Sequence, residues 1–389
     1  MEAEQLIKLY YNLGMSYNDI LSALLRRHGI LISRKHLLRI LKDNRLGRRR
    51  DFADLDSIFD FVQQQLQGPG KMHGYRWMFT KCRESGLKAR KEDVRMILAE
   101  LDPEGSALRK KRRLNRRQYF CKGPNHIWHI DSYDKLKPYG VCINGCIDGF
   151  SRKVIWVNAY KTSSDPKVIA GYFLEALETL GSCPRLVCTD RGTENGVLAA
   201  IQQHLRANHT DRLSGEQSYI AGVSTANQRI ESWWGILRKE GIEYWIQLLG
   251  EVRDQGMFDG GFLDKAILQL CIMGMIQEEL QKIKSVWNAH RIRPSTNLNV
   301  PAGIPNVMYL APELWDAEER AVTLDSNALA RLKGRCMFRS SVVCDPDVFD
   351  LCMMHIEDHG LQFPSENPVD AIDLYLTLRD AIKTQLHDN

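Results

Sequence analysis

The sequence has no long apolar run and no paired cysteine motif. No stretch approaches the roughly 20 consecutive apolar residues that a membrane-spanning helix needs, and the acidic start MEAEQLIKLYY differs from a signal peptide. We therefore expect an intracellular protein with no membrane partner. The ten cysteines stand inside apolar segments without any CxxC pair. This arrangement predicts reduced core thiols and argues against a structural zinc site.

Positive charge is unevenly distributed along the chain. The 389 residues exceed one ordinary domain, and the net charge is only +5. Arg48–Arg50 form one basic cluster. A second is the run RKKRRLNRR, which contains Arg109, Lys110, Lys111, Arg112, Arg113, Arg116 and Arg117. Most such runs are simply solvated, but this one suits a DNA phosphate backbone, and it equally resembles a nuclear-import signal, which predicts a nuclear location in a eukaryote.

Three segments each present a carboxylate at a defined place in a local pattern. Two apolar, β-branched runs stop at Asp131 and Asp190, which predicts buried strands with an acid at their C-terminal ends. Glu231 lies on a helix expected from 226 to 240, with Gly241 as its stop. Converging acids repel one another unless cations neutralise them, and oxygen ligands select Mg²⁺ or Mn²⁺. The simpler alternative is three solvated rim residues.

The words HID, TDRGTEN and NQRIES around these acids resemble the integrase core of retroviral integrases and insertion-sequence transposases, the DDE transposase superfamily. The similarity covers about residues 124–300. It implies catalysis by Asp131, Asp190 and Glu231, with two Mg²⁺ (or Mn²⁺) ions per active site. It also implies an α/β fold, a ribonuclease-H-like mixed five-stranded sheet with flanking helices. The spacing from Asp190 to Glu231 is slightly longer than is typical, which places extra residues in the loop 209–217.

The expected elements of the core agree with this fold. In order they are strands 128–135, 141–148 and 153–160, helix 166–180, strand 185–189, helix 196–208, strand 219–221 and helix 226–240. Asp148 precedes Gly149 in a turn dipeptide, so we interpret this acid as structural. Trp233 and Trp234 are expected to pack in the core, with base stacking as the alternative.

All-α helix-turn-helix modules are expected before the core. In the first, Ser16 and Ser33 begin helices, and the last helix turns Arg34, Lys35 and Arg39 outward, which suits a DNA major groove. A plain helical bundle is the alternative. The predicted units are a helix-turn-helix module at 1–50, a second helical module at 51–104, a basic linker at 105–121, the catalytic core at 122–300 and a C-terminal accessory region at 301–389.

Further DNA contacts are predicted within the core. Asn227 and Arg238 lie four residues before and seven after Glu231, on one helical stripe. We expect Asn227 to orient a metal ligand or the scissile phosphate, and Arg238 or its neighbour Lys239 to contact DNA. Arg291 follows a helix in a segment, WNAHRIRP, that resembles the end of the family's core, and it is a further candidate.

The resemblance implies a recombinase that acts on double-stranded DNA, both transposon ends and target, as a homo-oligomer. Two alternatives remain open. One is a domesticated, catalytically silent transposase that only binds DNA, and the other is a ribonuclease or structure-specific nuclease on the same fold.

Overall fold

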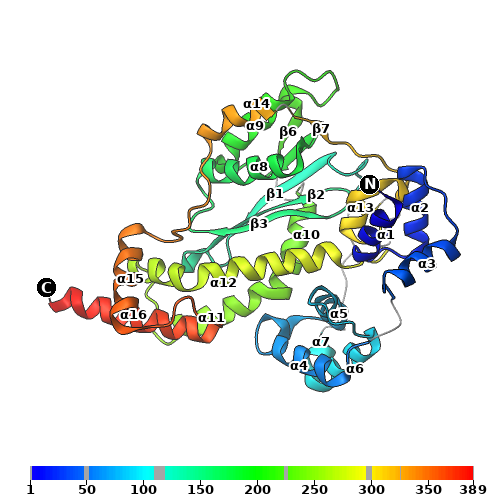
Figure 1. The fold of residues 1–389 in the computed structure, drawn as a ribbon. Helices are drawn as coiled ribbons and strands as arrows, with labels where there is room; N and C mark the ends of the chain where they lie inside the picture. Colours follow the sequence, from blue (N-terminus) through cyan, green and yellow to red (C-terminus); the bar gives the residue numbers. More distant parts are fainter. Residues whose placement is uncertain are drawn as a thin grey trace.

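The computed structural model describes residues 2–47, 52–108, 119–222, 227–294, 300–324 and 326–388. The basic cluster Arg48–Arg50 and the run Arg109–Arg117, which is predicted to contact DNA, lie outside these residues, so the role of the run stays a prediction. The described chain has a central sheet with helices on both faces, and helical units from both ends of the sequence lie at its sides (Figure 1). None of the described helices is long and apolar enough to cross a bilayer.

The central sheet has five strands in the order β3-β2-β1-β5-β6. They are β1 (Ile127–Tyr133), β2 (Cys142–Asp148), β3 (Val154–Tyr160), β5 (Leu186–Thr189) and β6 (Tyr219–Ala221). The first three form an antiparallel meander, whereas β5 and β6 run parallel to β1. This mixed sheet confirms the predicted α/β, ribonuclease-H-like fold class, and each predicted strand lies within two residues of its expected ends.

Helices cover both faces of this sheet (Figure 1). On one face lie α8 (Pro166–Leu180) and α9 (Gly196–Arg206), and on the other α10 (Gln228–Leu237) and α12 (Phe262–Ala289). On the first face, Trp128 of β1 is buried together with Phe173 of α8. On the second face, Trp233 and Trp234 of α10 are buried against the sheet. The two tryptophans of α10 therefore pack in the core. Because helices lie on both sides, β2 is buried at every position.

The edge strand β3 is covered by polar side chains of α12. Asn288 accepts a hydrogen bond from the Val154 N–H at 2.8 Å and donates one to the Val154 carbonyl at 3.0 Å. Gln277 and Gln281 bond further backbone groups of β3 at 2.7 and 2.9 Å. These amides take the place of a neighbouring strand, so the edge does not offer its backbone groups to another chain.

The first described segment forms the three predicted helices, α1 (Ala3–Asn12), α2 (Tyr17–His28) and α3 (Arg34–Asp43). The hydroxyls of Ser16 and Ser33 accept hydrogen bonds from backbone N–H groups in the first turns of α2 and α3. Each cap satisfies a donor that the helix leaves unpaired. Gly29 ends α2 in the left-handed conformation, at a φ of 66°.

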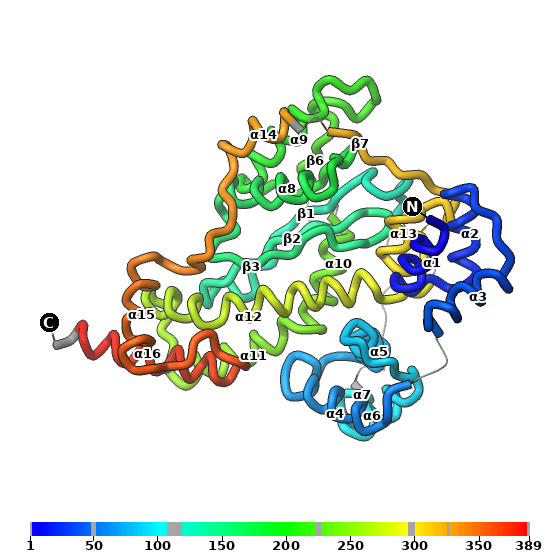
Figure 2. Tube along the Cα trace, viewed as in Figure 1, coloured from blue at the N-terminus to red at the C-terminus, as the bar shows by residue number. Residues whose placement is uncertain are grey.

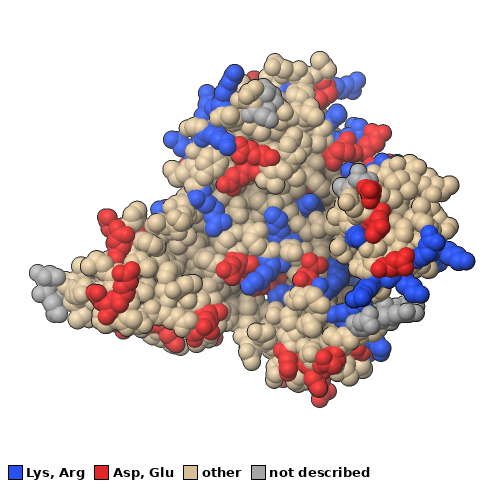
Figure 3. Space-filling view, in the orientation of Figure 1, with Lys and Arg blue, Asp and Glu red and all other residues tan. Residues whose placement is uncertain are grey.

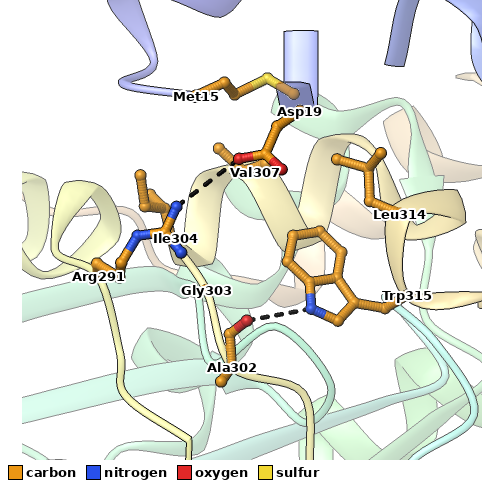
Figure 4. Close-up of a pocket in the computed structure, with 9 residues that line it drawn as sticks. All are labelled: Met15, Asp19, Arg291, Ala302, Gly303, Ile304, Val307, Leu314 and Trp315. Atoms are coloured by element: carbon orange, nitrogen blue, oxygen red, sulfur yellow. Dashed lines mark hydrogen bonds and ion pairs between the residues drawn. The ribbon is translucent and has the colours of Figure 1, made fainter. Parts of the chain in front are cut away.

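This three-helix unit docks on the segment that follows α12. There α13 (Pro305–Leu310) and the 3-10 helix η7 (Pro312–Trp315) contribute apolar side chains to the core of the unit. Figure 4 shows the pocket of about 220 Å³ at this junction. Across it Arg291 pairs with Asp19 at 3.7 Å, and the Trp315 indole donates to the Ala302 carbonyl at 3.1 Å. The unit therefore rests directly on the core.

Residues 52–108 form a second helical unit. Its elements are α4 (Leu55–Leu66), the 3-10 helix η1 (Pro69–Met72), α5 (Tyr75–Glu84), α6 (Lys91–Leu101) and α7 (Pro103–Leu108). The unit has its own apolar core, to which α4, α5 and α6 all contribute. It meets the rest of the chain where the buried His73 lies 3.7 Å from the Glu240 carboxylate, and where Lys81 lies 3.8 Å from Glu279.

The C-terminal region extends along the core instead of forming one separate accessory unit. Its elements are β7 (Val322–Thr323), which pairs with β4 (Ser182–Cys183), then α14 (Ser326–Leu332), α15 (Pro346–His359) and α16 (Pro368–Asp388). Figure 2 shows this tail passing from one end of the sheet to the other and ending against α12. There the buried carboxylate of Asp264 on α12 forms an ion pair with Arg379 of α16 at 3.0 Å.

The helix that carries Glu231 does not stop at Gly241, contrary to the sequence prediction. It continues through a π-helical turn, η6 (Arg238–Ile242), into α11 (Glu243–Asp254). A Cβ at position 241 would lie 2.4 Å from Cδ1 of Ile283 in α12. The glycine therefore allows close helix packing, and the local stop signal was misread for that reason.

Candidate functional site

Asp131 lies inside β1, two residues before its end, and not at the strand terminus that the sequence predicted. Its partner on β2 is Gly145. Because this glycine has no side chain, the ring of Trp234 occupies the space above it, where a Cβ would lie 2.8 Å from the ring. The Trp234 indole N–H donates to Oδ2 of Asp131 at 2.8 Å. The glycine and the tryptophan thus fix the first carboxylate.

Asp190 immediately follows β5, as predicted. Its Oδ1 accepts hydrogen bonds from the side-chain amide of Asn195 at 3.0 Å and from the Gly192 N–H at 3.3 Å. Since β5 runs parallel to β1, Asp190 lies at the edge of the sheet where the C-terminal end of β1 also lies. The turn that follows the strand therefore holds the second carboxylate.

A buried chain of hydrogen bonds attaches the start of α10 to β1. Asn227 accepts from Nδ1 of His129 at 2.8 Å and donates to the Ile130 carbonyl at 2.7 Å, and Nε2 of His129 pairs with the Tyr119 hydroxyl at 2.8 Å. Burial lowers the pKa of His129 to about 4, so the ring is neutral at pH 7. These hydrogen bonds fix Asn227 at the start of α10, and Glu231 follows one helical turn later.

The three acids influence one another. Burial raises the pKa of Asp131 to about 7, the charges of Glu231 and Asp190 raise it further, and the bond from Trp234 opposes the rise. Partial burial and the charge of Asp190 also raise the pKa of Glu231. No ion pair between described residues involves any of the three. The structure therefore brings together three carboxylates whose repulsion no lysine or arginine of the described chain relieves.

Residues 118–311 match a family model described as integrase core domain. The chain contains an integrase core domain. No curated protein matches the chain. The match covers the sheet, all three acids and α13, and it confirms the resemblance to the integrase core of DDE transposases. Proteins with this domain act on DNA and generally use divalent metal ions, so a general transposase-like or integrase-like function and a DNA partner follow.

The donor set of this integrase core fits a hard divalent cation. All three candidate ligands are carboxylates, and oxygen donors suit Mg²⁺ or Mn²⁺. Within the residues that the structure describes, no group of three His, Cys, Asp or Glu side chains is close enough to hold a metal ion as the side chains stand. Asp131 is turned toward Trp234, which accounts for part of this separation.

Trp234→Phe is expected to raise the Mg²⁺ concentration needed for half-maximal DNA cleavage by about five- to tenfold, because one hydrogen bond to the ionised Asp131 is lost. A metal titration of cleavage measures the effect. Trp233→Phe is the matched control, since the Trp233 indole N–H is buried without a hydrogen-bond partner in the structure. Equal Mg²⁺ midpoints for the two variants would contradict the role of Trp234.

Asn227 requires a correction in one respect. The sequence predicted that it contacts DNA, but its side chain is only 1% exposed, and both ends of its amide are bonded within the core. The role in orienting a metal ligand stays a prediction. The predicted spacing between Asn227 and Glu231 was correct, but this spacing could not show that the amide bonds His129 and Ile130. Asn227 instead acts as a structural anchor of α10.

Three other predicted DNA contacts, Arg34, Lys35 and Arg39, lie exposed on α3. Figure 3 shows Lys and Arg side chains over this part of the molecule. One face of α3 packs against α1 and α2 through the buried Leu37 and Leu41, and its basic face is exposed, as a recognition helix requires. Base contact by α3 stays a prediction.

The remaining predicted DNA contacts each have an acidic partner. Arg238 pairs with Glu243, and Lys239 lies 3.4 Å from Glu240. Arg291 pairs with Asp19 at the junction with α2, where its side chain is 61% exposed. The exposed Arg291–Asp19 pair contributes at most about 1 kcal/mol, whereas the acidic partners of Arg238 and Lys239 are mostly buried, at 19% and 7% exposed. Their DNA contacts stay predictions.

Sequence reasoning missed two hydrogen-bond donors of the site. Trp234 was interpreted only as a core residue, yet its indole also holds Asp131. Asn195, in the word TDRGTEN, holds Asp190, and its place five residues after the acid was the available signal. The donor role of Trp234 had no such signal, because it depends on the empty space above Gly145.

Asp148 has the structural role that the turn dipeptide predicted. Its fully buried carboxylate accepts bonds from the N–H groups of Asn125, Phe150 and Ser151 and from the Ser151 hydroxyl, at 2.7 to 3.2 Å. Burial raises its pKa to about 6, and these bonds oppose the rise. The acid therefore holds the turn between β2 and β3 to the segment before β1.

Proposed function

We propose that this protein is a DNA transposase or integrase-like recombinase that hydrolyses DNA ends and joins them to a target strand. The observation that carries the proposal is the set of three carboxylates on β1, after β5 and on α10. The charge of Asp190 raises the pKa of both Asp131 and Glu231, and none of the three has an ion-pair partner among the described residues. Divalent cations stabilise such a set and can catalyse phosphoryl transfer on DNA.

In this proposal Asp131, Asp190 and Glu231 would together hold two Mg²⁺ ions. When bound, the ions supply activation of a water or hydroxyl and neutralisation of the leaving oxygen. The protein contributes orientation: Trp234 directs Asp131, Asn195 directs Asp190, and the anchor at Asn227 fixes α10. Positioning of this kind accounts for most of the catalysis of phosphoryl transfer.

The proposed substrate is double-stranded DNA, as transposon ends and as target. The exposed basic face of α3 would read the terminal repeats, and the run Arg109–Arg117 would contact the phosphate backbone. Two ends that are joined together require two active sites, so a homo-oligomer on DNA belongs to the proposal.

The test is a joining assay with the full chain and a labelled duplex that ends in the terminal repeat of the element. We expect cleavage and joining that require Mg²⁺ or Mn²⁺. An RNA–DNA hybrid serves as the second substrate. Cleavage of the hybrid alone would overturn the recombinase in favour of a ribonuclease.

A catalytically silent, transposase-derived DNA-binding protein is the second candidate. It is favoured by the present orientation of the acids, which leaves no ready group of three metal ligands among the described residues. Salt-sensitive duplex binding without any joining at any tested concentration of Mg²⁺ or Mn²⁺ would support it over the recombinase.

A further inference from the structure

Four cationic side chains gather beside the turn between β2 and β3. We call them the turn cluster: Arg152, Lys153, Arg229 and Lys284. The Arg229 guanidinium donates to the Gly149 carbonyl at 3.1 Å. Burial and the charge of Arg229 lower the pKa of Arg152 to about 9, and burial and the charge of Lys284 lower the pKa of Lys153. The cluster therefore joins the turn to α10 and to α12.

The positive charge of the turn cluster is compensated only in part by the described residues. None of its members appears in an ion pair between described residues. Their contacts go to neutral groups, namely the carbonyls of Gly149 and Pro301 and the rings of Tyr119 and Tyr309. The carboxylate whose charge acts on Lys153 and Arg229 is Asp148, so one acid faces four cations. None of its four hydrogen bonds comes from the cluster.

The cluster is also poorly solvated, because all four side chains are only partly exposed. Like charges that are partly removed from water cost free energy unless a counter-charge is bound. Lys282 gives the contrast on the same helix. It is exposed and lies 3.9 Å from Glu278, as an ordinary surface lysine does. The arrangement of Lys284 and its neighbours instead leaves a place for an anion.

The turn cluster lies close to the catalytic acids. The turn is bonded to the first residue of β1 through Gly149 and Ile127, and Asp131 follows four residues later, about 13 Å along the strand. Arg229 lies within one turn of Glu231 on α10, but its side chain points to the other side of the helix, toward the turn at Gly149. Figure 3 shows separate Lys and Arg side chains at the centre of the face that lies over β3 and α12. A DNA strand at the acids would extend to this region.

We propose that the turn cluster binds phosphate groups of the DNA backbone beside the active site. This inference rests on the proposed action on DNA. Contacts to phosphates fix the position of a duplex without reading its sequence, and Lys and Arg are the side chains that make them. The basic run predicted to contact phosphates ends at Arg117, two positions before Tyr119, whose ring lies 3.9 Å from the Arg229 guanidinium carbon.

The experiment compares Lys284→Met with Lys282→Met in the full chain. Both changes remove one positive charge from α12, and only the first touches the turn cluster. Binding of a fluorescent duplex is measured over a range of salt concentrations without divalent metal. We expect Lys284→Met to weaken binding by about tenfold and to reduce the slope of log K against log[salt] by about one. Lys282→Met should match the wild type.

Thermal unfolding without DNA separates a binding role from a structural one. Lys284→Met and a second variant, Lys153→Met, are expected to unfold at the wild-type temperature or above it, because they relieve repulsion. Salt slopes for both variants equal to that of Lys282→Met would overturn the inference, whatever the unfolding temperatures. Failure of the wild type to bind duplex would overturn both this inference and the proposed function, whereas binding without joining would affect only the latter.

Discussion

Glu231→Gln is expected to lower strand transfer by about 10³-fold or more, because the proposed second metal ion would lose a charged ligand and several kcal/mol of charge stabilisation in the transition state. Gln has nearly the same volume as Glu, and the Glu231 side chain lies at the surface of α10, so the substitution should disturb no packing. DNA binding is expected to be unchanged. The measurement is joining of a labelled duplex in Mg²⁺, next to a binding isotherm for the same duplex.

Glu251→Gln is the matched control for this loss. Glu251 is an exposed acid on α11, the next helix, and carries no proposed role. It should join DNA at the wild-type rate. Asp131→Asn and Asp190→Asn should behave as Glu231→Gln does. Substantial joining by the Glu231 variant would remove this residue from the proposed metal site, and joining by all three variants would remove the mechanism.

Asp148→Ala is expected to lower the free energy of unfolding by about 4 kcal/mol, because three backbone N–H groups and one hydroxyl lose their buried acceptor. The loss should fall on the turn between β2 and β3 and on the segment at Asn125, which the carboxylate joins. Urea unfolding at neutral pH, followed by tryptophan fluorescence, measures it.

Asp165→Ala provides the comparison for Asp148. Asp165 accepts one backbone bond, at 2.8 Å, as the N-cap of α8, and loss of such a cap costs about 1 kcal/mol. Equal destabilisation by the two variants would show that Asp148 does not organise the turn. Loss of joining without loss of stability in Asp148→Ala would instead point to a catalytic role for this acid.

The elements of the core were predictable because their signals are local. Apolar β-branched runs placed β2, β3 and β5 within one residue of their observed starts, and the predicted helix 166–180 coincides with α8. The acid at 131 was expected where its apolar run stops, but pairing with β2 continues past it to Tyr133, and such pairing is a property of the sheet.

Other predictions failed where tertiary packing overrides a local pattern. Gly241 has the form of a helix stop, but it serves the contact with Ile283, 42 positions away in the sequence. Asn227 lies on the predicted stripe with Glu231, but its amide is used by His129 and Ile130. No chemistry could be predicted for the tail after residue 300, and only the structure shows that its helices pack on α8 and α12.

The sequence by itself determined the identity and order of the three carboxylates and the strands and helix that carry them, since these follow from periodicities within a few residues. Only the tertiary structure decided the surroundings of each acid. The Trp234 indole and Asp131 are 103 positions apart, and the cations of the turn cluster come from a turn and two separate helices. Contacts of this length depend on how the sheet and its helices pack, and no local pattern records them.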